Sequence, residues 1–163
     1  APNPGHLIFR TSWLFATWGG NFAKTILRLA RERDEIRVVA DQHGAPTSAE
    51  LLADVTTLAL YRHGNGGSDT LAGTYHVAAG GETTWYDYAR YVFEEARKDG
   101  IELKAGPERI RAIATEDYPL PAARPRSSRL DTGKLEKTFN LSLPDWRTHV
   151  ARVVAELAAL GRA

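Results

Sequence analysis

The pattern of apolar and polar positions along the first 46 residues predicts two strands with a helix between them. Residues 6–15 begin with an apolar run and turn polar at Arg10, which is typical of a buried strand that ends at a sheet edge. Residues 21–33 then repeat apolar side chains at helical spacing on one face: Phe22, Ile26, Leu29 and Ala30. Residues 36–40 form a second short apolar run, and a loop at residues 41–46 follows it.

The middle of the chain continues this alternation. Thr47 and Glu50 have the spacing of a capping box, so we expect a helix to begin there. Its inward side chains are expected to be Leu51, Val55, Leu58 and Ala59. A glycine-rich loop at residues 63–68 separates this helix from a strand at residues 73–78. Thr84 then caps a helix over residues 85–98, whose buried side chains are expected to be Ala89, Val92, Phe93 and Ala96.

The pattern weakens after Gly100. Residues 110–114 predict a short strand, and the three prolines within residues 118–126 predict an irregular extended loop. Asp131 is expected to cap a short helix that ends near Phe139. The last helix starts at Pro144-Asp145-Trp146 and carries one apolar stripe: Val150, Val153, Val154, Leu157 and Leu160. Strands that alternate with helices indicate an α/β or α+β architecture.

Composition narrows the possible partners. The 163 residues suffice for one domain, or for a domain with an appendage. The formal net charge is +1, from 21 basic and 20 acidic residues, so the sequence gives no electrostatic reason to bind nucleic acid or an anionic membrane. No apolar run approaches the roughly 18 residues that span a bilayer, and no signal peptide is recognisable. We therefore expect a cytoplasmic protein with no nucleic acid or membrane partner.

Most of the common catalytic motifs are missing from the sequence. The chain has no cysteine, which excludes disulfides, thiolate metal sites and a cysteine nucleophile, and its five histidines lack metal-ligand spacing. The glycines at 64, 66 and 67 follow a predicted helix rather than a strand, so they predict a turn and not a dinucleotide-binding loop. No P-loop, no nucleophile elbow and no tyrosine followed four residues later by lysine is present. The sequence therefore assigns no catalytic residue.

Five segments, in their order and spacing, resemble dTDP-4-dehydrorhamnose reductase, a family of extended short-chain dehydrogenases/reductases. They are Phe9-Arg10-Thr11-Ser12-Trp13, Asn21-Phe22-Ala23-Lys24-Thr25, Val39-Ala40-Asp41-Gln42-His43-Gly44-Ala45-Pro46-Thr47, Gly73-Thr74-Tyr75-His76 with Gly80 and Thr84-Trp85, and Ala123-Arg124-Pro125-Arg126 with Ser128, Leu130 and Asp131. The resemblance covers only the carboxyl-terminal half of that family. A chain that opens with Ala1 and leads at once into a strand fits a piece of a larger α/β protein.

The resemblance implies a fold and an activity. The fold would be a partial Rossmann-like, NAD(P)-binding α/β fold joined to the small α+β substrate-binding domain of extended reductases. Residues 1–163 would form the carboxyl-terminal substrate-binding part, and the glycine-rich cofactor loop and the Tyr/Lys pair would lie in the absent half. The intact protein would reduce dTDP-4-dehydro-L-rhamnose to dTDP-L-rhamnose with NADPH or NADH. This chain alone would be inactive.

The resemblance also implies roles for residues that follow the first predicted strand. Trp13 would contact the deoxysugar, because an indole offers a flat apolar face to a sugar ring; the alternative is a core tryptophan. Thr11 and Ser12 would lie near the nicotinamide of the cofactor, and the alternative is that they are simply polar residues at a strand end.

Arg124 would grip the diphosphate of the sugar nucleotide, since a guanidinium meets phosphate oxygens in a bidentate way. The alternatives are a solvated surface arginine, or Arg126 or Arg129 in the same role. Asn21 and Gln42 carry amides suited to binding a base or phosphate. The alternatives are helix capping for Asn21 and turn formation for Gln42.

Glu50 and Glu156 match positions at which some family members are described as dimers bridged by Mg2+, and oxygen ligation suits that ion. The competing interpretation of Glu50 is its place in the capping box. We expect His76 to satisfy a backbone group rather than to act as an acid. A homodimer is thus one possible assembly.

A different class of function also fits the sequence. The chain could be a non-enzymatic nucleotide-sugar-binding or protein-interaction module of the same fold, because fold does not fix function. The discriminating observation is whether the gene encodes a preceding half with a glycine-rich cofactor loop and a Tyr/Lys pair.

Overall fold

The computed structural model describes residues 5–64, 71–118 and 124–161. Its strands are β1 Leu7–Arg10, β2 Leu14–Phe15, β3 Ile36–Val39, β4 His43–Gly44, β5 Thr47–Ser48, β6 Gly73–His76, β7 Thr83–Thr84 and β8 Ile110–Ile113. Its helices are α1 Phe22–Glu32, α2 Ala49–Arg62, α3 Trp85–Lys98, α4 Gly133–Phe139 and α5 Trp146–Ala159, with short 3-10 turns η3 Pro107–Arg109 and η4 Thr115–Asp117.

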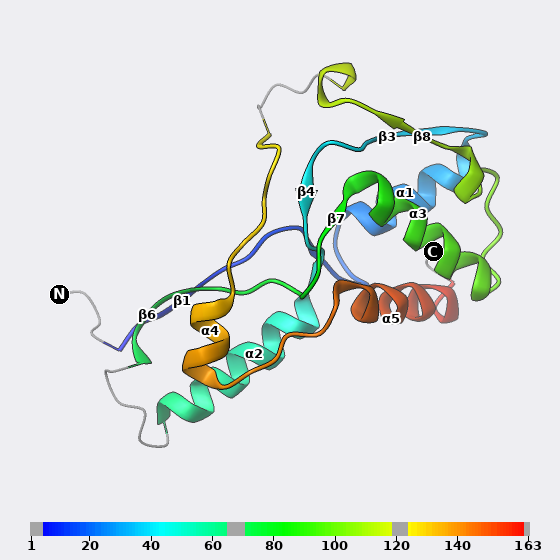
Figure 1. Cartoon of the computed structure of the whole chain (residues 1–163). Coiled ribbons are helices and arrows are strands. Elements are labelled where there is room, and N and C mark those ends of the chain that lie inside the picture. Colours follow the sequence, from blue (N-terminus) through cyan, green and yellow to red (C-terminus); the bar gives the residue numbers. More distant parts are fainter. Residues whose placement is uncertain (1–4, 65–70, 119–123, 162–163) are drawn as a thin grey trace.

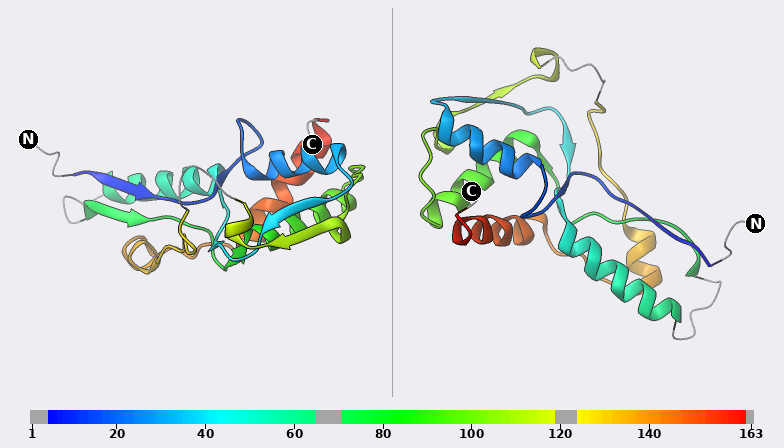
Figure 2. Two further views of the ribbon diagram at one scale, coloured as in Figure 1. Left: turned by 90° about the horizontal axis from the view of Figure 1, so that it is seen from above. Right: turned by 180° about the vertical axis from the view of Figure 1, so that it is seen from behind.

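The elements form two lobes (Figure 1). In the first lobe, β1 pairs in parallel with β6, with Leu7 opposite Gly73 and Arg10 opposite His76. Helices α2 and α4 lie on the same side of this strand pair in Figure 1 and in the right-hand view of Figure 2. On β1, the side chain of Ile8 is 49% exposed. This arrangement is one half of a parallel α/β layer whose other face is not covered by the described residues.

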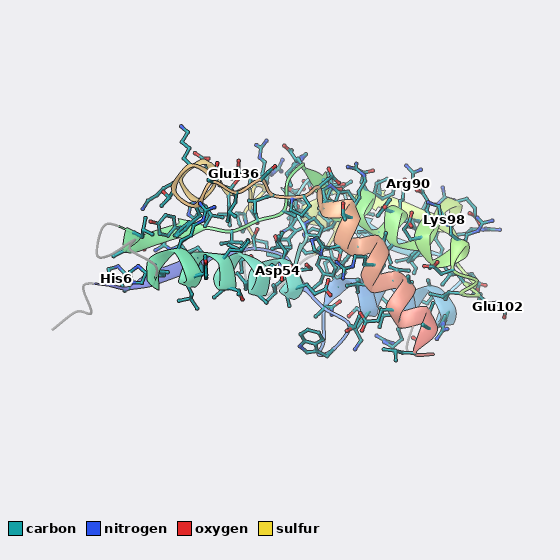
Figure 3. All side chains as sticks on the ribbon, turned by 90° about the horizontal axis from the view of Figure 1, so that it is seen from below. His6, Asp54, Arg90, Lys98, Glu102 and Glu136 are labelled. Atoms are coloured by element: carbon teal, nitrogen blue, oxygen red, sulfur yellow. The ribbon has the colours of Figure 1, made fainter. Side chains whose placement is uncertain are left out.

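The second lobe is built around α3. Strands β3 and β8 pair in parallel, with Ile36 opposite Ile110. Helix α3 packs against this strand pair and against α1 and α5. Its inward side chains Ala89, Val92, Phe93 and Ala96 are all buried, as the sequence predicts. Figure 3 shows charged side chains such as Arg90 and Lys98 extending outward from the same helix.

The chain passes between the lobes several times, and each passage is held by strand pairing. The first three passages lead into α1, α2 and α3. They are held by the β2–β5 pair, with Leu14 opposite Thr47, and by the β4–β7 pair, with His43 opposite Thr84. Isolated bridges hold the passages before and after α4, one between His43 and Ser127 and one between Gly80 and Asp145. The junction is therefore a set of short paired segments rather than a single linker.

Several expectations from the sequence need correction. The strand expected over residues 6–15 is two strands, because the backbone of Trp13 turns into the left-handed region with φ 49°. Helix α2 begins one residue later than a Thr47 cap implies. Its cap is Ser48, whose Oγ accepts from the Leu51 N–H at 3.0 Å. The hydroxyl of Thr47 is instead buried, donating to the Ala45 carbonyl and accepting from the Ala79 N–H, each at 3.2 Å.

Two apolar side chains expected in the core are exposed. Leu58 is 45% exposed because it lies two turns along α2 from the junction, where the described residues do not cover that face. Leu160 is 49% exposed because α5 ends at Ala159, and the rest of its stripe is buried. In α1, Ile26 and Ala30 are buried, whereas Phe22 and Leu29 are only partly buried.

The remaining elements follow the sequence closely. Thr84 caps α3 as expected, and α5 starts at Trp146, within the expected start, with Asp145 as its cap. The Asp131 carboxylate accepts from the Gly133 N–H at 2.9 Å, although the residue directly before α4 is Thr132. Most of the expected loops at 63–68 and 118–126 lies outside the described residues. In the described part of the chain, no helix is long and apolar enough to span a membrane.

Candidate functional site

A groove of about 820 Å³ runs along the second lobe. It is lined by one side of α1, by β3, by the start of α3 and by the segment that follows β8. Part of its lining is aliphatic. The polar, charged and aromatic part is formed by Phe22, Thr25, Arg33, Glu35, Arg37, Gln42, Trp85, Thr115, Tyr118 and Arg124. A second cavity of about 580 Å³ lies at the far end of α3 and contains none of the residues singled out by the sequence.

The groove brings together two residues that are far apart in the sequence, Gln42 and Arg124. Backbone hydrogen bonds position both segments. The His43 N–H donates to the Arg126 carbonyl, and the Ser128 N–H donates to the His43 carbonyl, both at 2.8 Å. The segment that carries Arg124 therefore lies beside the segment that carries Gln42.

Gln42 is only 6% exposed, and its amide takes part in a hydrogen-bonded chain. Its Nε2 donates to Thr115 Oγ1 at 3.2 Å, and Thr115 Oγ1 donates to Asp41 Oδ1 at 2.6 Å. The Thr115 N–H donates to the same oxygen at 3.0 Å. These bonds from Thr115 lower the pKa of Asp41 against the opposing effect of burial, and the charge of Arg126 adds to the lowering.

Arg124 differs in its ion pairing from Arg126 and Arg129, the two alternative candidates for binding the diphosphate. Arg126 pairs with Glu116 at 2.8 Å, and Arg129 pairs with Glu82 at 3.0 Å. The bond from Arg129 is the main cause of the lowered pKa of Glu82. Among the described residues, no carboxylate lies within ion-pair distance of Arg124. Of the three arginines, Arg124 is thus the one that lines the groove without a described carboxylate to neutralise it.

Trp13 supports the aromatic wall of the groove. Its indole stacks on that of Trp85, with ring centroids 3.6 Å apart and an interplanar angle of 15°. A methyl group at Gly44 would come within 2.6 Å of Cε2 of Trp13, so this glycine backbone lies close against the ring. Trp85 also contacts Phe22 in the groove at 4.6 Å between centroids. Contact between Trp13 and a sugar stays a prediction.

Both polar atoms of the Asn21 amide form hydrogen bonds with nearby backbone groups. Its Oδ1 accepts from the Lys24 N–H at 3.2 Å, and its Nδ2 donates to the Ala16 carbonyl at 2.7 Å. Asn21 is therefore the cap of α1. A role in binding a base or phosphate stays a prediction.

Thr11 and Ser12 lie just beyond β1, at the carboxyl edge of the β1–β6 pair. Ligands of open α/β sheets bind at this edge. The hydroxyl of Ser12 donates to the Ser128 carbonyl at 3.2 Å. The Oγ1 of Thr11 is buried and has no hydrogen-bond partner among the described residues. A buried hydroxyl without a hydrogen-bond partner, at the edge of the sheet where ligands bind, suits contact with a ligand.

Glu50 and Glu156 do not form a magnesium site within the described part of this chain. Glu50 Oε1 accepts from Arg152 at 3.3 Å, and Oε2 lies 3.5 Å from Nδ1 of the buried His149. Glu156 is exposed on α5. No group of three metal-ligating side chains occurs among the residues that the structure describes. Because cationic and imidazole groups already face Glu50, the residues present do not fit the ion.

The sequence pattern misses several residues of the site. The apolar pattern does not mark Asp41 and Thr115 as site residues, although each directly follows a predicted strand. Because β3 and β8 are parallel neighbours, polar residues just beyond them meet at the same edge. A polar residue directly after a predicted strand is therefore a signal in the sequence for a residue of the site. Tyr118 and Phe22 carry no comparable signal, because aromatic residues at such positions are as common in cores.

His76 lies at the end of β6, where its ring nitrogen Nδ1 is 3.1 Å from the Asp131 carbonyl. This contact agrees with the backbone role expected for the residue.

Comparison with known proteins agrees with this geometry. The chain is 55% identical over 152 residues to dTDP-4-dehydrorhamnose reductase of Shigella flexneri, covering 93% of this chain and 50% of that protein. A reductase structure of this name from Clostridium acetobutylicum matches with a TM-score of 0.78 and 32% identity, covering 99% of this chain and 50% of the other. A structure of the same name from Bacillus anthracis, in complex with NADP, matches with a TM-score of 0.75 and 35% identity. The match covers 92% of this chain and 48% of the other.

The chain thus spans about half the length of the relatives it matches. The likeness confirms a partial Rossmann-like α/β fold joined to a small α+β part. The RmlD substrate binding domain matches residues 1–159, which is nearly the whole chain. On this match and these relatives, the chain belongs to the family of RmlD substrate-binding domains.

Proposed function

We propose that residues 1–163 form the sugar-nucleotide-binding half of a dTDP-4-dehydrorhamnose reductase. The intact protein then reduces the C4 ketone of dTDP-4-dehydro-L-rhamnose to give dTDP-L-rhamnose. The observation that carries this proposal is the groove, which combines the guanidinium of Arg124, the amide of Gln42 and the aromatic wall of Trp85. The similarity to reductases of this name supports the choice of substrate.

The groove suits each part of a nucleoside diphosphate sugar. A diphosphate needs a cation that no carboxylate neutralises, a condition that Arg124 meets among the described residues, as do Arg33 and Arg37 in the same groove. A base needs a hydrogen-bonding group at fixed geometry and an apolar surface, which Gln42 and the aliphatic lining provide. The sugar then lies toward the wall formed by Trp85, with Trp13 stacked behind it.

The cofactor contact proposed for this chain is limited to Thr11 and Ser12. The buried Oγ1 of Thr11, unpartnered among the described residues, fits a carboxamide such as the one on nicotinamide. When bound, NADPH or NADH supplies the hydride for the reduction. The sequence contains no G-x-G-x-x-G motif between a strand and a helix and no Tyr/Lys pair to donate a proton. We therefore infer that this chain alone is inactive.

The first lobe supports the inference that further polypeptide completes the fold. Parallel sheets are normally covered on both faces. In the described part of the chain, β1 pairs only with β6, and Ile8 is 49% exposed on β1. An unpaired edge with apolar side chains favours docking of further strands, or self-association when they are absent. A homodimer of the intact protein remains part of this proposal.

Two measurements on the chain test the proposal. Calorimetric titration should detect binding of dTDP to the chain, and NADPH oxidation with dTDP-4-dehydro-L-rhamnose should be absent. Adding the separately expressed amino-terminal half of the Shigella flexneri relative should restore oxidation. The two halves of that relative, mixed in the same way, are the positive control.

The outcomes separate the alternatives. Failure to bind dTDP, or oxidation by the chain alone, contradicts the proposal. Binding without restored oxidation, when the control mixture is active, favours a non-enzymatic nucleotide-sugar module instead.

A further inference from the structure

The chain of hydrogen bonds from Asp41 through Thr115 to Gln42 fixes which amide atom of Gln42 faces the groove. A carboxylate only accepts hydrogen bonds, so Asp41 Oδ1 takes the single proton of the Thr115 hydroxyl at 2.6 Å. The Thr115 N–H donates to the same oxygen at 3.0 Å and holds the carboxylate in place.

With its proton committed to Asp41, Thr115 Oγ1 has only lone pairs left for Gln42. It therefore accepts from the amide nitrogen of Gln42, at 3.2 Å, and would repel the amide oxygen. An amide that is free to flip presents oxygen or nitrogen with similar ease. Here the carboxylate, two bonds away, decides the orientation.

The other amide atoms of Gln42 are left for a ligand. Its Oε1 accepts no hydrogen bond from a described residue, and Gln42 lines the groove. The side chain is 6% exposed, so burial holds its position as well as its orientation. The groove thus offers an acceptor at one fixed place, in surroundings where an unmatched polar contact is costly.

Such an acceptor distinguishes between pyrimidine bases. Thymine and uracil carry a ring N3–H, which donates to a fixed oxygen. Cytosine in the same position presents the N3 lone pair, and two acceptors repel one another. A methyl group on the base has no part in this contact, so thymine and uracil are treated alike by Gln42.

Resting on the proposed function, we propose that Thr115 and Asp41 are positioning residues. They lock the Gln42 amide with its oxygen toward the groove, so that the site selects an imide base, thymine or uracil, over cytosine.

The test compares the dissociation constants of the chain for dTDP, dUDP and dCDP by calorimetry. The unaltered chain is expected to bind dTDP at least about tenfold more tightly than dCDP, since a buried unmatched acceptor is worth about that much. Thr115→Val removes the hydroxyl and should bring this ratio close to one. Thr115→Ser keeps the hydroxyl and should keep the ratio. The ratio of dTDP to dUDP should stay the same in all variants, because it does not depend on the amide.

Two further variants keep the test decisive if Thr115→Val does not fold. Asp41→Ala removes the acceptor of the Thr115 hydroxyl, which frees its proton for the amide oxygen of Gln42, so the ratio of dTDP to dCDP should fall. Gln42→Leu removes the amide, and the ratio should fall in the same way.

Several results would overturn the inference. One is equal binding of dTDP and dCDP by the unaltered chain. Another is an unchanged ratio in folded Thr115→Val and Asp41→Ala when Gln42→Leu abolishes the preference for dTDP over dCDP. Failure of the proposed function looks different, because then none of the three nucleotides binds the unaltered chain.

Discussion

The indole rings of Trp13 and Trp85 lie nearly parallel, with their centroids 3.6 Å apart. This contact joins the segment after β1 to the first residue of α3, and so it spans the junction between the two lobes. Gly44 covers the Trp13 ring so closely that a side chain there has no room. The three residues form a layered unit that supports the groove wall.

Gly44→Ala is expected to destabilise the chain by about 1–3 kcal/mol, because the added methyl group overlaps the Trp13 ring. The backbone of Gly44 does not adopt a positive φ, so the effect is steric and not conformational. Urea unfolding measures it. In a Trp13→Ala background the methyl group has space, and the cost of Gly44→Ala should largely vanish. Equal costs in both backgrounds would contradict the layered arrangement.

Arg124→Ala is expected to weaken binding of dTDP by roughly 1.5–3 kcal/mol, because a charge-assisted contact to diphosphate is lost. Arg126→Ala is the matched control, since its guanidinium is already paired with Glu116 and Asp41. Calorimetric titration of both variants with dTDP makes the comparison. If Arg126→Ala weakens binding and Arg124→Ala does not, the diphosphate contact belongs to Arg126.

The first lobe leads to a prediction about assembly. Ile8→Lys should reduce self-association of the chain at high concentration, because a charge on an unpaired strand opposes edge-to-edge contact. Leu58→Lys is the control, since Leu58 is similarly exposed but lies on α2. Light scattering over a concentration series measures the change. A chain that is monomeric throughout, or that responds equally to both substitutions, contradicts association through β1.

Local signals in the sequence predicted the helices well, because caps and apolar spacing act within a few residues. Thr84 before α3 and Asn21 before α1 are examples. Thr47 and Ser48 are a case in which local signals do not decide the helix cap. Both suit a helix cap, and only the bond from the Ala79 N–H, made across the junction, explains why Thr47 is buried and Ser48 caps.

The site was predictable only in part, for a similar reason. Gln42 and Arg124 were identified by resemblance, but their meeting depends on backbone bonds between His43 and residues 126 and 128. The positive φ of Trp13 and its contact with Gly44 depend on the packing of three segments, so no local pattern reports them. The contact between Asp41 and Thr115 depends on the parallel pairing of β3 with β8, two strands that lie far apart along the chain.

Asp41 also gives the chain a specific dependence on pH. Hydrogen bonds from Thr115 are the main reason that the pKa of Asp41 lies below its ordinary value of 3.8. A carboxyl group whose pKa is lower in the folded state stabilises the fold when ionised. Its contribution is therefore complete above about pH 5 and is lost as the pH falls below 3.8 through the lowered pKa.

Asp41→Asn should reduce the free energy of unfolding at pH 6, and the difference from the unaltered chain should shrink toward pH 3. The reason is that a protonated Asp41 and the asparagine that replaces it are both uncharged, so the two proteins become alike in acid. Urea unfolding at several pH values measures the difference. Asp54→Asn is the control, because this carboxylate on α2 is exposed and forms no ion pair with a described residue (Figure 3 labels it). A deficit for Asp41→Asn that is the same at pH 3 as at pH 6 would show that its bonds with Thr115 do not depend on the charge.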